Sequence, residues 1–179
     1  MKIVRKGTRI AFGPVRLSYV HVLEAYAFEG GQPKFSCNAL IPKGEKELVK
    51  ELEAAIKEAE AEGSAKLWKG AKPKYDSPVR DGDEKADDVY KGHWFVNPKS
   101  TKKPQVIDKN NNTITSEDDV YSGAWFYVSI AAYPYSVSGS KGVALALNNL
   151  KKFKDDERLS GGPGAEEDFA EFGDEEDDL

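Results

Sequence analysis

Cysteine and histidine are scarce in this chain, which has one Cys (Cys37) and two His (His21 and His93) among 179 residues. A single cysteine excludes an internal disulfide and any zinc cluster built on cysteines. Cys37 lies in an alternating apolar segment, where a small buried residue is the favoured interpretation. No serine or cysteine falls in a known nucleophile motif. The sequence therefore predicts a protein that is not an enzyme and needs no metal or cofactor.

Long apolar runs are also missing. No segment has the roughly 20 consecutive apolar residues that a membrane-spanning helix requires. The first residues lack the basic and apolar regions of a secretory signal. We therefore expect a protein of the reducing cytoplasm that does not bind a membrane.

Basic residues are absent from the last 14 positions, 166–179, which carry nine acids. The whole chain has a net charge of −5, yet residues 1–154 hold 25 Lys and Arg against 19 Asp and Glu. Such a like-charge run is typically disordered and often serves as an interaction tail. We predict a folded, mildly basic domain over residues 1–154 and a flexible acidic tail over 155–179. The tail either occupies the basic surface as a nucleic acid would, or only increases solubility.

Alternating apolar patterns predict a mainly β domain with one helix. The helix is expected over residues 45–62, where one apolar stripe recurs at helical spacing and Gly63 follows as the residue after the cap. Gly13-Pro14 is interpreted as a turn between two strands. The strands are expected within residues 3–12, 15–28, 33–41, 92–97, 124–135 and 143–153.

The segment 124–135 is the most informative of these strands. Its even positions, from Phe126 to Ala132, form a natural core face, and its odd positions include several aromatic residues. Exposed rings on a sheet can stack on unpaired bases, each stack contributing about 1–3 kcal/mol. Residues 90–135 hold nine of the 19 aromatics, and lysines lie close to them in sequence.

Rings interleaved with bases indicate a single-stranded nucleic acid as partner, because cations bind phosphates and flat rings stack on bases. The predicted stacking residues are Trp68, Tyr75, Trp94, Phe95, Tyr127, Tyr133 and Tyr135. The predicted phosphate partners are Arg80, Lys99, Lys102, Lys103, Lys141, Lys151 and Lys152. For any single ring, a place in the core is an equally good interpretation.

Two alternatives come from other classes of protein. A metal-dependent nuclease would use the acids of the segment 81–88, namely Asp81, Asp83, Asp87 and Asp88. That segment has Lys85 and Ala86 where a calcium-binding EF-hand loop needs a ligand and a glycine, so a solvated acidic loop is favoured. The other alternative is a structural protein whose acids contact a basic partner.

Several short stretches, taken in order, resemble a phage family once catalogued as a domain of unknown function and since grouped with single-stranded DNA-binding proteins. The chain is more distantly similar in layout to the T7-type phage single-stranded DNA-binding proteins. The stretches that carry the resemblance span most of residues 10–155 and are Phe12-Gly-Pro-Val-Arg-Leu-Ser-Tyr19, Leu40-Ile-Pro-Lys43, Pro78-Val-Arg-Asp-Gly-Asp83, Tyr121-Ser-Gly-Ala-Trp125 and Gly142-Val-Ala-Leu-Ala-Leu-Asn-Asn-Leu150.

The resemblance implies an OB-fold, a five-stranded Greek-key barrel with one helix, which also fits the pattern of short strands. It implies sequence-tolerant binding of single-stranded DNA during phage replication and recombination in the infected bacterial cell. It further implies a tail that recruits a polymerase, helicase or nuclease, for which we expect the apolar anchors Phe169, Phe172 and Leu179. T7-type tails end in an aromatic residue, whereas this chain ends in Asp178-Leu179. The sequence leaves open whether the chain forms a homodimer.

Overall fold

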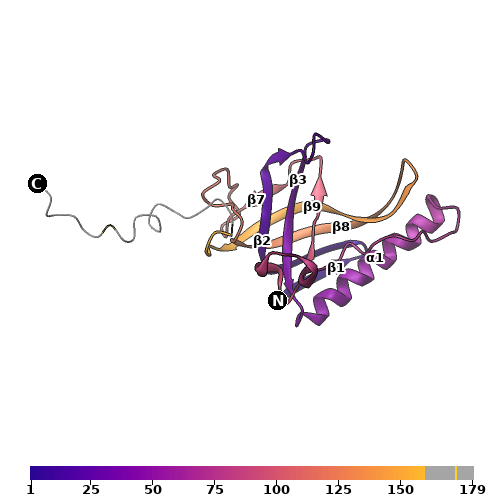
Figure 1. The fold of residues 1–179 in the computed structure, drawn as a ribbon, viewed down its shortest axis with the longest axis horizontal. Helices are drawn as coiled ribbons and strands as arrows, with labels where there is room; N and C mark the ends of the chain where they lie inside the picture. The colour runs from indigo at the N-terminus through magenta and orange to yellow at the C-terminus, as the bar shows by residue number, and fades with distance from the viewer. Residues whose placement is uncertain (160–171, 173–179) are drawn as a thin grey trace, which may run out of the picture.

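The fold is seen in a computed structural model, which describes residues 1–159 and residue 172. The chain is mainly β, as expected (Figure 1). Its elements are β1 (Lys2–Lys6), β2 (Arg9–Tyr26), β3 (Lys34–Pro42), α1 (Lys46–Lys66), β4 (Arg80–Asp81), η1 (Gly82–Glu84), η2 (Asp88–Tyr90), β5 (His93–Val96), β6 (Lys99–Ser100), β7 (Gln105–Ile107), β8 (Trp125–Val137) and β9 (Ser140–Lys154).

The strands close into a ring. The order β2-β8-β9-β6-β3 returns to its start because β3 also pairs with β2. Most neighbours are antiparallel, whereas β6 and β7 run parallel to β9. The ring confirms the predicted mainly β barrel-like fold with one helix, although it is irregular because β6 supplies only two residues.

The predicted turn at Gly13-Pro14 is wrong, because both residues lie inside β2. The turn occurs earlier, at Gly7-Thr8, between β1 and β2. Gly13 has a φ of 144°, and a Cβ there would lie 2.8 Å from the carbonyl oxygen of Phe126 in β8. Glycine is therefore needed because the two strands approach closely.

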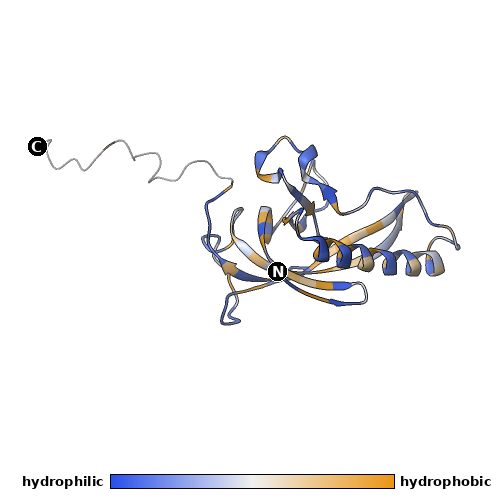
Figure 2. Cartoon of the chain, turned by 90° about the horizontal axis from the view of Figure 1, so that it is seen from below, coloured by the Kyte–Doolittle hydropathy of each residue, from blue (hydrophilic) through white to orange (hydrophobic). Residues whose placement is uncertain are grey.

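One apolar stripe of α1 packs against the sheet, mainly on β8 (Figures 1 and 2). The stripe consists of Leu48, Leu52, Ala55, Ile56 and Ala59, as predicted. The predicted end at Gly63 is wrong, since the helix continues to Lys66. Gly63 is buried, and the Trp68 indole and Pro134 fill the space beside its Cα. This glycine makes room for a ring instead of ending the helix.

The even face of β8 is buried, as its pattern predicted: Phe126, Val128, Ile130 and Ala132 all belong to the core. Cys37 is fully buried among the same residues, and burial raises the pKa of its thiol to about 12. The thiol is therefore protonated near neutral pH, which fits its interpretation as a packing residue. In the described part of the chain, no helix is long and apolar enough to cross a membrane.

A buried polar network joins β3, η2 and β5. The Asn38 side-chain amide donates to the Tyr90 hydroxyl oxygen at 2.7 Å, and the Asn97 amide donates to Asn38 Oδ1 at 2.6 Å. Tyr90 is fully buried, and its ring packs edge-on against Phe95 with centroids 5.1 Å apart. Satisfied buried networks of this kind fix a unique arrangement of the strands that carry them.

Gly63→Ala is expected to destabilise the protein by about 1–2 kcal/mol. Overpacking against Trp68 and Pro134 costs about 1–3 kcal/mol, which exceeds the gain of up to about 1 kcal/mol in helix propensity. Urea unfolding followed by circular dichroism measures the change. Gly44→Ala is the matched control, since nothing lies within 4 Å of the added Cβ. A Gly63→Ala protein as stable as the wild type would contradict this packing.

Tyr90→Phe is expected to lower the free energy of unfolding by about 1–3 kcal/mol, because it leaves the buried Asn38 amide without its acceptor. Thermal and urea unfolding provide the measurement. Tyr26→Phe is the control, because Tyr26 is exposed and its hydroxyl makes no hydrogen bond to a described residue. Equal stability of the two variants would show that the network contributes nothing.

Candidate nucleic-acid interface

A cavity of about 240 Å³ opens on the surface of the ring where β2, β3 and β5 meet. We call it the barrel-face cavity. Its lining combines two exposed rings, one buried ring, three cations and three small polar side chains. These residues are Tyr19, Phe28, Phe95, Arg80, Lys85, Lys99, Ser36, Asn38 and Asn97. No carboxylate among residues 1–159 and 172 lines it.

The exposed rings result from a change of face along β2. The core-facing apolar side chains of β2 are Ile10 and Phe12 before the irregularity at residues 13–14, and Val15 and Leu17 after it. Tyr19 then has a φ of 48°, and the β2–β3 register shifts after Ser18 and again after His21. A bulge of this kind re-aims the following side chains. Tyr19 is consequently 52% exposed and Phe28 is 55% exposed.

The rings at this end of β2 form a continuous row. His21 stacks on Tyr26 with centroids 4.5 Å apart, and Tyr26 meets Phe28 edge-on at 4.8 Å. Partial burial lowers the pKa of His21, so its imidazole is mainly neutral at pH 7 and adds to the apolar row. The row extends the aromatic surface beyond the barrel-face cavity.

Each cation of the cavity lies over a ring. Lys99 Nζ is 5.9 Å from the Phe28 centroid, while Arg80 Cζ and Lys85 Nζ are 5.2 and 5.3 Å from that of Phe95. None of the three pairs with a carboxylate among residues 1–159 and 172. Positive charge and flat apolar surface therefore occupy the same place, without an internal counter-ion.

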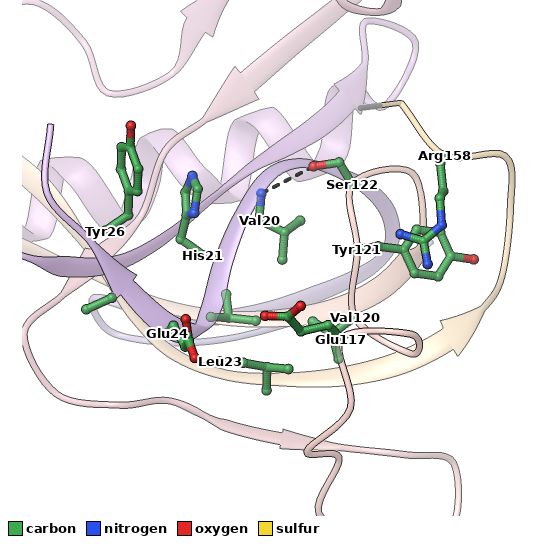
Figure 3. Close-up of a pocket in the computed structure, with 12 residues that line it drawn as sticks. Val20, His21, Leu23, Glu24, Tyr26, Glu117, Val120, Tyr121, Ser122 and Arg158 are labelled. Atoms are coloured by element: carbon green, nitrogen blue, oxygen red, sulfur yellow. Dashed lines mark hydrogen bonds between the residues drawn. The ribbon is translucent and has the colours of Figure 1, made fainter. Parts of the chain in front are cut away.

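A larger neighbouring cavity, of about 360 Å³, lies on the other side of the aromatic row (Figure 3). His21 and Tyr26 line it, but so do the carboxylates of Glu24 and Glu117. Arg158 is the one Lys or Arg residue in this lining, and its guanidinium lies 4.3 Å from the Tyr121 centroid. Its acidic lining makes this cavity a poorer phosphate site than the smaller one.

The structure brings only part of the predicted site together. Arg80, Phe95 and Lys99 share the barrel-face cavity, but Phe95 is 2% exposed and forms part of its floor. Trp94 points to the opposite face of β5, where Lys43 Nζ lies 4.7 Å from its ring centroid. Of these two predicted rings, neither offers a free face within the cavity.

A second set of predicted residues gathers at the tip of the β8–β9 hairpin, which extends to the same side as the C-terminal end of α1 (Figure 1). Trp68 is 3% exposed, and its indole donates to the Tyr135 carbonyl at 3.2 Å. The Tyr75 hydroxyl donates to Glu60. Tyr133, at 42% exposed, and Lys141 remain accessible there.

The other predicted residues lie in two further places. Tyr127 packs edge-on against Phe153, and Lys151 donates to Asn111 Oδ1 at 2.9 Å. Lys152 is largely buried and pairs with Asp155 at 2.6 Å, so its charge is already neutralised. The remaining two, Lys102 and Lys103, line a separate groove beside β9.

Sequence reasoning missed Tyr19, Tyr26, Phe28 and Lys85. The signal that it overlooked is the position of Tyr26 and Phe28 at the end of a strand, directly before Glu29-Gly30-Gly31. Aromatic residues that lie next to a turn and are flanked by acids have few buried positions in which to pack. The exposure of Tyr19 depends on a bulge that alternation alone does not reveal.

Three of the four acids of the nuclease alternative, Asp81, Asp83 and Asp87, have structural roles. Lys43 Nζ binds Asp81 at 2.7 Å and Asp83 at 2.5 Å, and these hydrogen bonds hold the pKa of both carboxyls below the usual value. Asp81 caps η1 and Asp87 caps η2. Within residues 1–159 and 172, no three His, Cys, Asp or Glu side chains come together as a metal site.

Residues 155–159 lie against the ring. Arg16 donates to the Glu157 carbonyl at 2.6 Å, the Trp125 indole donates to Asp156 at 2.8 Å, and the Leu159 amide donates to the Ser122 carbonyl at 2.9 Å. Leu159 packs on the Leu40, Tyr90 and Phe95 cluster, next to the barrel-face cavity. Of the predicted tail anchors, Phe172 is exposed, whereas Phe169 and Leu179 fall outside the described residues.

Solved structures of two phage proteins share this fold. The single-stranded DNA-binding protein of bacteriophage Enc34 in complex with single-stranded DNA is 24% identical, with a TM-score of 0.73, covering 87% of this chain and 91% of that protein. The single-stranded DNA-binding protein encoded by bacteriophage T7 is 16% identical, with a TM-score of 0.60, covering 96% and 97%. At these identities the likeness shows the fold.

Sequence comparison gives the family. A protein of Acyrthosiphon pisum secondary endosymbiont phage 1, described as putative protein p50, is 31% identical over 162 residues, which cover 86% of this chain and 88% of that protein. The family model described as Enterobacter phage Enc34, ssDNA-binding protein, matches residues 8–179. The resemblance stated from the sequence is thus confirmed, and the chain belongs to the phage single-stranded DNA-binding protein family of Enc34.

Proposed function

We propose that this chain binds single-stranded DNA at the barrel-face cavity, with little dependence on sequence. One observation carries the proposal: two exposed rings, Tyr19 and Phe28, lie beside three cations that have no carboxylate partner in the described chain. Family membership and the Enc34 protein solved with single-stranded DNA support it. The face formed by the second and third strands of an OB-fold is also where such folds bind oligonucleotides.

The chemistry divides between rings and cations. Tyr19, Tyr26 and Phe28 stack on bases, and every base has a flat face, so stacking tolerates any sequence. Lys85, Lys99 and Arg80 bind phosphates, which releases counter-ions and makes affinity depend on salt. Asn97 lies in the same lining and its Oδ1 offers an acceptor to base edges or sugars, whereas the Asn38 side chain is engaged in the buried network.

The hairpin tip is a second candidate surface. It retains Tyr133 and Lys141 in exposed positions, and both were predicted from the sequence as DNA contacts. Its rings are fewer, however, because Trp68 is buried and Tyr75 is engaged with Glu60. The barrel face is therefore the first choice, and variants at the two places distinguish them.

The acidic segment 166–179 is proposed to compete with DNA for the barrel face and, once displaced, to recruit replication proteins such as a polymerase, helicase or nuclease. Its support is charge complementarity and the place of Leu159, which packs on the cluster that includes Phe95 of the cavity floor. A short tether raises the local concentration of such a segment to roughly the millimolar range. On this basis we propose a role in phage DNA replication and recombination.

Phe28→Ala is expected to weaken binding of oligo-dT by about 5–150-fold, the equivalent of the roughly 1–3 kcal/mol of one lost stack. Replacing both Lys85 and Lys99 with Gln should weaken binding further at low salt and flatten its salt dependence. Fluorescence anisotropy at two salt concentrations measures both effects. Tyr133→Ala, a ring of similar exposure at the hairpin tip, is the matched control. A larger loss at Tyr133 than at Phe28 would move the site to the hairpin, and equal losses would refute a site confined to the barrel face.

Deleting residues 166–179 is expected to tighten oligo-dT binding, most clearly at low salt, because a competing polyanion is removed. The control is a full-length chain in which the nine acids of this segment are replaced by Asn and Gln. The two proteins should bind alike if charge causes the competition. Unchanged affinity in both would refute competition while leaving DNA binding at the barrel face intact.

A further inference from the structure

A second basic groove lies beside the barrel-face cavity, between the start of β2, the loop after β6, and β9. Its volume is about 390 Å³. Three cations and several amide or hydroxyl side chains line it, and in the described part of the chain no carboxylate or aromatic ring does. The lining residues are Arg9, Ser100, Lys102, Lys103, Gln105, Ala146, Leu147, Asn148 and Asn149.

The three cations are available to a ligand. Arg9, Lys102 and Lys103 are all exposed, and none of their side chains pairs with an acid or donates a hydrogen bond to a partner among residues 1–159 and 172. Some other cations of the fold are paired with acids: Arg5 binds Glu51 at 2.6 Å, for example. Three such charges in one concave surface attract a polyanion.

The amides of the groove add neutral hydrogen-bond donors. Asn149 Oδ1 accepts the backbone N–H of Gln105 at 3.4 Å, which turns the oxygen toward β7 and leaves the side-chain NH₂ without a described partner. Lys, Arg and amide groups all donate to phosphate oxygens. Because no ring lines the groove, it offers nothing on which a base can stack. Its chemistry therefore fits the sugar–phosphate backbone alone.

The groove and the barrel-face cavity are separated by the single short strand β6. Lys99 lines the cavity, whereas Ser100 and Lys102, which follow it directly, line the groove. In the sheet, Lys99 pairs with Ser36 of the cavity on one side and with Ala146 of the groove on the other. A strand that leaves the cavity past Lys99 therefore reaches the groove next.

We propose that this groove is a second DNA subsite, which holds the phosphates of the segment leaving the barrel-face cavity. The inference rests on the proposed function of that cavity. It divides the DNA path into a stacking part, with the rings around Phe28, and a purely electrostatic part, with Lys102 and Lys103. A short oligonucleotide fills the first part only, and a longer one engages both, within the roughly 4–16 nucleotides that an OB-fold covers.

The test compares two lengths of DNA on the full chain. Lys102→Glu/Lys103→Glu should leave the Kd for a short oligo-dT, of about five nucleotides, within about twofold of wild type. For an oligo-dT of about 20 nucleotides it should raise the Kd by about tenfold or more. The slope of log K against log salt for the longer DNA should fall by about 1.4, since each phosphate contact on a single strand contributes about 0.7. Lys46→Glu/Lys50→Glu, with the same charge change on the exposed side of α1, is the control.

Equal weakening of both lengths, or the same loss in the α1 control, would overturn the inference, because the effect would then come from net charge alone. Unchanged binding of the longer DNA would overturn it as well. This holds even if the double variant changes how strongly deletion of residues 166–179 affects binding. Failure of the wild-type chain to bind either length would instead refute the proposed function, and this inference with it.

Discussion

The change of face along β2 is the constraint on which the rest of this molecule depends. One strand must pair with β8 along its first half and with β3 along its second, because only this double pairing closes the ring. The register of β2 against β8 shifts between Phe12 and Val15, and its register against β3 shifts after Ser18 and again after His21. Such irregularities bend a strand and re-aim its side chains. The strand that closes the ring therefore also carries Tyr19 and Tyr26, exposed rings of the kind on which bases stack.

Charge is distributed according to a similar division. Cations that hold the architecture are paired, as Lys43 is with Asp81 and Asp83, and Arg16 with the backbone of residues 123 and 157. Cations at the barrel-face cavity and at the second groove are unpaired in the described chain, and those of the cavity lie over rings. Ion pairs at an exposed surface contribute little to stability. The two groups of cations therefore differ in whether they are available to bind a ligand, and the net charge of the chain does not reveal this difference.

Much of the fold followed from the sequence, because periodicity reports burial directly. The core face of β8 and the apolar stripe of α1 were predicted correctly, and the family assignment confirmed that the chain is a binding protein and not an enzyme. Gly13 and Gly63 were misread because a glycine that makes room for a neighbour looks like one that turns or ends an element. The site was harder to predict: Arg80 and Lys99 lie in the cavity, but Trp68 and Phe95 are buried, and Tyr19 emerges only through a bulge that depends on tertiary pairing.

Residues 155–159, which lie against the ring, limit how far from it the following acids can reach. Leu159 is held by its backbone hydrogen bond to Ser122, and six residues lie between it and Glu166, the first of the terminal acids. A fully extended chain spans at most about 3.6 Å per residue, so over these seven steps that first acid stays within roughly 25 Å of Leu159. The first acids of the segment therefore act close to their own molecule.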